Sequence, residues 1–151
     1  MEVVTGSQSK IYFSISTMHN IASKPCHSCP YRCDVPSGIW DVTEYDKLPE
    51  YDKETFEQPQ KMFLCHQQNG CLCRGWLDCH GSHLLSIRIA SVMGLVDDNQ
   101  LEQAFNEGPK VAVFSSGAEA AKHGKRGIKQ LSVAALGMIQ KLVSKRKRTK
   151  R

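Results

Sequence analysis

The sequence predicts a small α+β or irregular domain, built from a cysteine-rich metal-bound module packed on helices, with a basic C-terminal tail. Three observations support this prediction. All seven cysteines lie between positions 26 and 79. Apolar residues recur at helical spacing in the second half of the chain. The last seven residues, KRKRTKR, carry six positive charges.

The length of 151 residues suits one ordinary domain, or a small domain followed by a tail. A hydrophobic content of 40% allows a core, which metal ligation would help to stabilise. We expect an N-terminal segment at 1–24, a cysteine-rich metal-binding module at 25–83, a helical support region at 84–144 and the basic tail at 145–151.

The first twenty residues contain no basic segment followed by a long apolar run, so the sequence predicts no signal peptide. No window approaches the roughly 18 apolar residues of a membrane span. We therefore expect a cytoplasmic protein without membrane contact. In a reducing compartment, clustered cysteines are more often metal ligands or redox groups than disulfides, and seven is an odd number.

The first half of the chain offers two short elements. Alternating apolar residues at 11–15 predict a short strand. Tyr45 and Leu48 lie on one face of a short helix, which Pro49 is expected to stop.

The second half is mostly helical by its pattern. Residues 83–95 predict a well-buried helix that supports the metal module. Asp97 or Asp98 caps a following helix that Gly108-Pro109 closes, because an Asp side chain accepts hydrogen bonds from the free amides of a first turn. The run VAVF at 111–114 predicts a strand.

Two further helices complete the prediction. Ser116 and Glu119 have the spacing of a capping box before a short helix. The last helix carries a core-facing stripe of Leu131, Ala135, Met138 and Leu142, and then frays into the basic tail.

Cys26 and Cys29 form the strongest local signal. Two intervening residues let both sulfurs reach one ion from a tight turn, as in zinc knuckles and many iron–sulfur loops. A second cluster of four cysteines follows about forty residues later. A tetrahedral zinc site needs four ligands, and Cys26, Cys29, Cys65 and Cys73 are sufficient for one. Cys79, His66 and His80 provide an alternative set or a second ion.

The identity of the metal is less constrained by the sequence. Pro30 directly follows Cys29, as in ferredoxin-type runs, which favours an iron–sulfur cluster. The neighbouring histidines favour zinc, because imidazole is a good zinc ligand. We expect zinc, with an iron–sulfur cluster as the alternative.

The motifs KPCHSCPYRCDVPSGIW, FLCHQQ, CRGWLDCH and VFSSGAEAAKHG resemble domain-of-unknown-function family 6283, small proteins of bacteria, especially actinobacteria, and their phages. The resemblance covers about residues 24–143. All seven candidate metal ligands match its motif positions, whereas Cys33 and Cys71 depart from them. The family name implies no activity.

No enzyme can be assigned from the sequence, because adjacent Cys-His pairs do not aim the two side chains at each other and no third orienting group is identifiable. A phosphate-binding glycine loop and a zinc-protease signature are both missing from the sequence.

The charge of the chain is divided unevenly. Residues 1–116 hold nine Lys/Arg and fourteen Asp/Glu, whereas residues 117–151 hold eleven Lys/Arg and one Asp/Glu. Dense Lys and Arg attract phosphate backbones without regard to base sequence. The candidate nucleic-acid contacts are Lys145, Arg146, Lys147, Arg148, Lys150 and Arg151.

Together these features favour a non-enzymatic accessory or regulatory protein, whose zinc stabilises the fold and whose tail contacts DNA or RNA non-specifically. The alternative is an iron–sulfur protein in redox sensing or electron transfer. The sequence identifies no protein partner.

Overall fold

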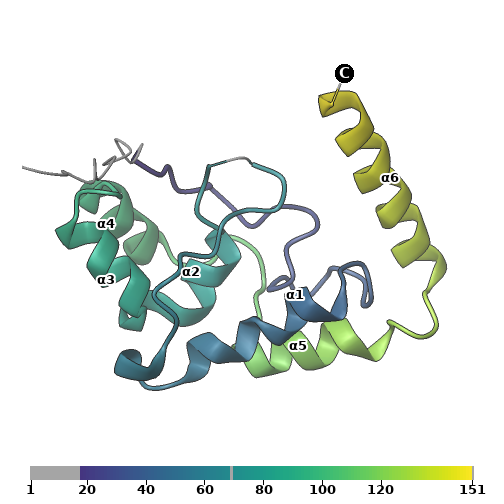
Figure 1. Ribbon diagram of the computed structural model, residues 1–151, viewed down its shortest axis with the longest axis horizontal. Coiled ribbons are helices and arrows are strands. Elements are labelled where there is room, and N and C mark those ends of the chain that lie inside the picture. The colour runs from purple at the N-terminus through teal and green to yellow at the C-terminus, as the bar shows by residue number, and fades with distance from the viewer. Residues whose placement is uncertain (1–17, 69, 151) are drawn as a thin grey trace, which may run out of the picture.

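A computed structural model describes residues 18–68 and 70–150, and its regular elements are helices (Figure 1). The α-helices are α1 (Val42–Asp46), α2 (Arg74–His80), α3 (Leu85–Val92), α4 (Asp98–Glu107), α5 (Gly117–Arg126) and α6 (Val133–Thr149). Short 3-10 helices lie at Leu48–Asp52, Thr55–Glu57 and Gly81–His83. The segments between them are irregular.

The β part of the predicted fold is wrong for the described residues. Extended segments there pair only through isolated bridges, and none forms a sheet. The expected strand at 111–114 makes one bridge, from Val113 to Arg32. Arg32 lies in a series of tight turns, so the pairing cannot continue into a ladder. The expected strand at 11–15 lies outside the described residues.

Most of the predicted helix signals are confirmed. The Asp97 carboxylate caps α4 by accepting hydrogen bonds from the amides of Asn99 and Gln100, and Gly108 ends that helix with φ +67°. The Ser116 side chain caps α5 by accepting from the Glu119 amide at 3.1 Å. The buried helix expected at 83–95 is present as α3.

Pro49 behaves differently from the prediction. It lies at the second position of the 3-10 helix that directly follows α1, instead of stopping all helical structure. Proline has no N–H to donate and its fixed φ suits a helix start, so it is compatible with a first turn.

Helix α2 was not predicted. It begins directly after Cys73 and ends at Gly81, whose φ is +66°. At seven residues it is too short for an amphipathic period to show, and no side chain caps its first turn. Close packing explains its position instead: a Cβ atom on Gly75 would lie 2.5 Å from the Cys29 Sγ, so this helix approaches the first cysteine loop without a side chain between them.

The main core surrounds the cysteine segments and consists largely of aromatic residues. Tyr31, Tyr45 and Trp76 are each at most 1% exposed. Phe63 packs edge-on against Tyr31, with ring centroids 5.8 Å apart. Cys29 and Cys73 lie within the same core. Two buried thiols are therefore part of the hydrophobic interior.

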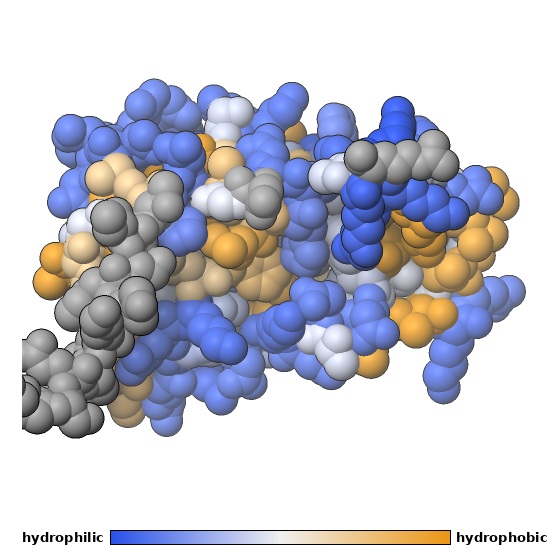
Figure 2. Space-filling view, turned by 45° about the horizontal axis from the view of Figure 1, so that its top comes forward, coloured by the Kyte–Doolittle hydropathy of each residue, from blue (hydrophilic) through white to orange (hydrophobic). Residues whose placement is uncertain are grey.

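Helix α6 stands apart from the other helices at one end of the molecule (Figure 1). Its predicted stripe is confirmed in part: Leu131, which precedes the helix, and Ala135 and Met138 join a small second core with Val35 and Ile39, whereas Leu142 is half-buried and lies outside that core. The helix continues to Thr149, so the predicted fraying before the tail is wrong up to that residue. Lys and Arg are good helix formers, which favours this continuation. Figure 2 shows strongly hydrophilic side chains at its C-terminal end beside hydrophobic ones.

Candidate metal centre

Two backbone turns bring the four cysteines of the predicted zinc set together. In the first loop, the Cys29 amide donates to the Cys26 carbonyl at 3.0 Å, which folds the pair into a tight turn. In the second, the Cys65 amide donates to the carbonyl of Cys71, and the Cys73 amide to that of Phe63. The second loop is therefore closed on itself, with Cys65 and Cys73 near its base.

The sulfur atoms of the two loops are in contact. The Sγ atoms of Cys29 and Cys73 lie 3.6 Å apart in the buried core. Two sulfurs bound at about 2.3 Å to one tetrahedral zinc ion lie about 3.8 Å apart. All seven cysteines of the chain are free thiols. The separation of this pair is thus that of two thiols able to share one ion.

Three of the four thiols have a raised pKa, and neighbouring thiols are among the causes. The pKa of Cys26 is raised, chiefly by a hydrogen bond with Cys29, although another with Cys65 lowers it. The pKa of Cys65 is raised first by its hydrogen bond with Cys26 and then by burial. For Cys29, the hydrogen bond from Cys26 lowers the pKa, but Cys73 and burial together outweigh it.

These mutual effects link Cys65 to Cys26, Cys26 to Cys29 and Cys29 to Cys73, and in the last of these pairs the sulfurs are in contact. They do not make a finished cage: across residues 18–68 and 70–150, no three Cys, His, Asp or Glu side chains are disposed to hold an ion as they stand. The thiols of Cys26, Cys29 and Cys65 are protonated in this arrangement, because a raised pKa favours the neutral form. A metal ion binds the thiolate, so its binding would release these protons.

Two neighbouring groups reach the sulfurs or the loop that carries them. The amide of Gln68 donates to the Cys65 Sγ at 3.4 Å, and the Ser28 hydroxyl lies 3.7 Å from the Cys26 Sγ. Gln67 in turn donates to the Ser28 hydroxyl at 2.5 Å. Such contacts orient ligands and stabilise negative sulfur. Sequence reasoning missed Ser28 and Gln67, because neither residue type is a metal ligand.

His66 lies beside the thiols but is occupied by other contacts. Its Nε2 is 3.2 Å from a carboxylate oxygen of Glu44, and its ring lies 4.4 Å from that of Trp40. Its Nδ1 is buried and finds no hydrogen-bond partner in the described chain. Burial lowers the pKa of His66, which Glu44 partly offsets, so the ring is neutral near pH 7. A neutral imidazole with one free nitrogen can still bind a metal ion.

Cys79 and His80 belong to a different cluster on α2. The Tyr31 hydroxyl lies 3.1 Å from His80 Nε2, and Asp52 lies 3.7 Å from His80 Nδ1. Burial lowers the pKa of His80 to about 4, against a smaller opposing effect of Asp52. Burial, with the charge of Asp52, raises the pKa of Cys79 to about 12, so this thiol is not an activated nucleophile.

Asp52 is the residue of this second cluster that sequence reasoning missed. Its carboxylate accepts hydrogen bonds from the amides of Gly117 and Ala118 at 2.7 and 2.8 Å, at the first turn of α5. A carboxylate stabilises the positive end of a helix. Asp52 is thus committed to capping α5. The spacing of 65 residues left no local signal that could have found it.

The two cysteines that depart from the family motifs lie away from the paired sulfurs. Cys33 is exposed, and its amide donates to the Ala112 carbonyl. Cys71 contributes its carbonyl to closing the second loop and is half-buried. Neither has a sulfur contact among the hydrogen bonds of the described residues.

The predicted nucleic-acid residues of the tail are exposed where they are described. Lys145, Arg146, Lys147 and Arg148 occupy the last turns of α6, Lys150 directly follows the helix, and Arg151 lies outside the described residues. The Lys145 Nζ donates to Gln67 at 3.2 Å, and the Arg146 guanidinium lies 5.8 Å from the centre of the Trp40 ring. The basic end of α6 is therefore docked on the second cysteine loop, which the sequence did not predict.

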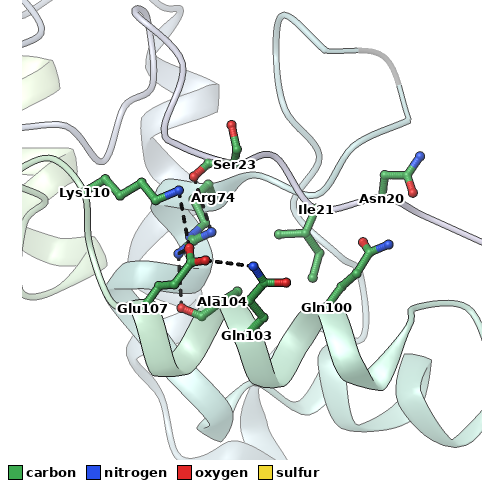
Figure 3. A pocket seen from close by; sticks show the side chains of 9 residues that line it. All are labelled: Asn20, Ile21, Ser23, Arg74, Gln100, Gln103, Ala104, Glu107 and Lys110. Carbon is green, nitrogen blue, oxygen red and sulfur yellow. Dashed lines mark hydrogen bonds and ion pairs between the residues drawn. The ribbon is translucent and has the colours of Figure 1, made fainter.

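A separate cavity of about 360 Å³ lies beside Arg74 (Figure 3). The Arg74 side chain is buried and paired with Asp78 at 2.9 Å. It also donates to the carbonyls of Ala104 and Gly108 at 3.1 and 3.2 Å, tying α2 to the end of α4. Because these groups occupy the guanidinium, Arg74 has a structural role here: it holds α2 against the C-terminal end of α4.

Comparison of the chain with known protein families, curated proteins and solved structures identifies a family and nothing more specific. Residues 21–137 match the family of unknown function DUF6283, so the match ends within α6, before the basic residues 145–150. Neither a curated protein nor a solved structure matches the chain. In the part of the chain that the structure describes, no helix is both long and apolar enough to span a membrane. With 117 of its 151 residues matched, the chain belongs to DUF6283, a family of unknown function.

Proposed function

We propose that this chain is a non-enzymatic, zinc-stabilised accessory or regulatory protein of the cytoplasm, which contacts nucleic acid non-specifically through the basic end of α6. The observation that supports it best is the contact between the two cysteine loops, in which the Sγ atoms of buried Cys29 and Cys73 lie 3.6 Å apart and half-buried Cys26 and Cys65 influence each other's pKa. The seven free thiols are compatible with a reducing compartment.

Zinc would cross-link two segments that have little regular structure of their own. The first loop is a run of turns, and the second is closed by a few backbone hydrogen bonds. The free energy of binding structural zinc, about 10–16 kcal/mol in small zinc domains, becomes folding free energy. Cys26, Cys29, Cys65 and Cys73 would hold the ion, and His66 is the nearest replacement.

An iron–sulfur cluster is the second candidate, and the donor set favours it in one respect. All four converging side chains are thiols, and clusters are held by Cys thiolates. The histidines that favoured zinc in the sequence are engaged elsewhere: His80 contacts Tyr31 and Asp52, and His66 contacts Glu44. This alternative implies a role in redox sensing or electron transfer.

The deciding experiment is to purify the chain without oxygen, record its visible spectrum and measure zinc and iron per chain. A colourless protein with about one zinc supports the structural site. A brown protein with iron and labile sulfide supports the cluster instead. A folded protein with neither metal would refute both.

The nucleic-acid contact is tested separately by deleting residues 145–151. We expect this deletion to abolish salt-sensitive binding to DNA and RNA, because it removes six positive charges. Metal content should not change, because the deleted residues contain no candidate metal ligand. Unchanged binding without these residues would refute the contact.

A further inference from the structure

A cavity of about 310 Å³ lies between the C-terminal half of α6 and the loops that carry Trp40 and Cys65. It differs in composition from the Arg74 cavity, because its lining combines an aromatic ring with exposed cations. Lys145, Arg146 and Lys150 line it from α6.

Trp40 gives the cavity a fixed flat surface. Its ring is half-buried, and its Nε1 donates to the Ser28 carbonyl at 2.8 Å, so the ring is anchored to the first cysteine loop. The His66 ring packs against it at 4.4 Å, with the two planes 34° apart. An anchored indole loses little freedom when a second ring stacks on it.

The cations are placed to reach what is attached to such a ring. The Arg146 guanidinium already lies 5.8 Å from the Trp40 centre, and Arg side chains both stack on rings and bind phosphate with two parallel hydrogen bonds. Lys145, in the last turns of α6, and Lys150, which directly follows its last residue, both line the cavity beside Arg146. The Glu44 carboxylate, which contacts His66 of the lining, is also paired with Lys47 at 2.7 Å.

We propose that this cavity binds an unpaired nucleotide of a single-stranded nucleic acid, with its base stacked on Trp40 and its phosphates held by Lys145, Arg146 and Lys150. This inference rests on the proposed nucleic-acid contact and adds a place and a substrate class to it. Bases in a duplex are stacked on each other and cannot reach a ring in a cavity, whereas single-strand sites combine a cationic track with aromatic platforms.

Intrinsic tryptophan fluorescence gives a direct test. The chain has two tryptophans, and Trp76 is 0% exposed, so it provides a constant background. Titration with an oligo(dT) of about 15 nucleotides is expected to quench the Trp40 fraction of the signal. A duplex of the same length should bind through the basic residues without quenching.

Three variants sharpen this test. Trp40→Leu should weaken oligo(dT) binding about tenfold while changing duplex binding less than about twofold. Lys145→Gln should weaken both, whereas Lys141→Gln, an exposed position of α6 that does not line the cavity, should affect oligo(dT) binding less. Circular dichroism and metal content establish that each variant is folded.

Three outcomes would overturn the site: equal quenching by the duplex, an unchanged preference for single strands in Trp40→Leu, or equally strong quenching by a free mononucleotide. None of these outcomes refutes the proposed non-specific contact of the basic end of α6 with nucleic acid. That contact is refuted only if deletion of residues 145–151 leaves duplex binding intact. The two failures are therefore distinguishable.

Discussion

The body of the molecule, residues 18–128, and helix α6 are held in place by very different amounts of buried surface. In the body, Tyr31, Cys29, Leu48, Leu72, Trp76 and Leu84 are all fully buried. On α6 only Ala135 is buried, while Val133 is 88% exposed. The difference indicates that the body determines the fold, whereas α6 presents charge and depends on the body for its position.

The largest expected effect comes from a thiol of the body. Cys29→Ser should lower the free energy of unfolding by about 3–5 kcal/mol and the Tm by about 10 °C, because it places a hydroxyl in an apolar core and removes a proposed metal ligand. Thermal unfolding and metal content measure the two consequences. Cys33→Ser, at an exposed cysteine away from the set, is the matched control and should change neither. Equal behaviour of both variants would contradict the four-thiol site.

A pH effect of similar size is expected at His80 in the body. Its folded-state pKa of about 4 lies below its ordinary value of 6.5, so the folded state binds the proton more weakly than the unfolded chain does. The stability that depends on neutral His80 is complete above about pH 6.5 and is lost as the pH falls through about 4, for a total of about 3 kcal/mol.

Urea unfolding between pH 7 and pH 4 measures this loss. His80→Gln should show a shallower fall than the wild type, since Gln does not titrate, and both proteins share any acid-induced loss of metal. His83→Gln, at an exposed position nearby, should follow the wild-type curve. Identical slopes for wild type and His80→Gln would show that His80 does not carry the effect.

Two glycines sharpen the comparison, because the same substitution should act in opposite directions. In the body, a Cβ on Gly124 of α5 would collide with the Tyr45 ring, so Gly124→Ala should destabilise by about 1–3 kcal/mol. On α6, Gly137 has open space around its Cβ position, so Gly137→Ala should stabilise that helix by about 0.5–1 kcal/mol. Chemical denaturation measures the first, and helical circular dichroism the second. The same sign for both would be inconsistent with a loosely packed α6.

The smallest expected effects come from two helix caps. Ser116 caps α5 and Ser132 caps α6, each by accepting one amide hydrogen bond at 3.1 Å. Replacement by Ala costs about 1 kcal/mol at either site. Ser116→Ala should lower the global Tm, whereas Ser132→Ala should only speed hydrogen exchange within α6. A global change from Ser132→Ala would mean that α6 unfolds together with the body.

The caps and periodicities that the sequence predicted correctly are local. Asp97 with Gly108, Ser116 with Glu119, and the stripe through Ala135 and Met138 each involve residues close in sequence, and short-range hydrogen bonding or packing decides them. The strand expected at 111–114 was wrong, because a strand needs a distant partner of matching shape. Helix α2 was missed for the complementary reason: its position depends on contact with Cys29.

The sequence by itself determined the candidate metal ligands, two thiols at knuckle spacing and a second cluster of four cysteines, and the six basic residues at the C-terminus, because residue type and spacing decide which chemistry is available. Only the tertiary structure decided how they are combined. It placed Cys29 beside Cys73 and separated His80 from them. It also turned the basic end of α6 against Trp40. These are contacts between residues far apart in sequence, which depend on packing of the whole chain and leave no periodic trace in it.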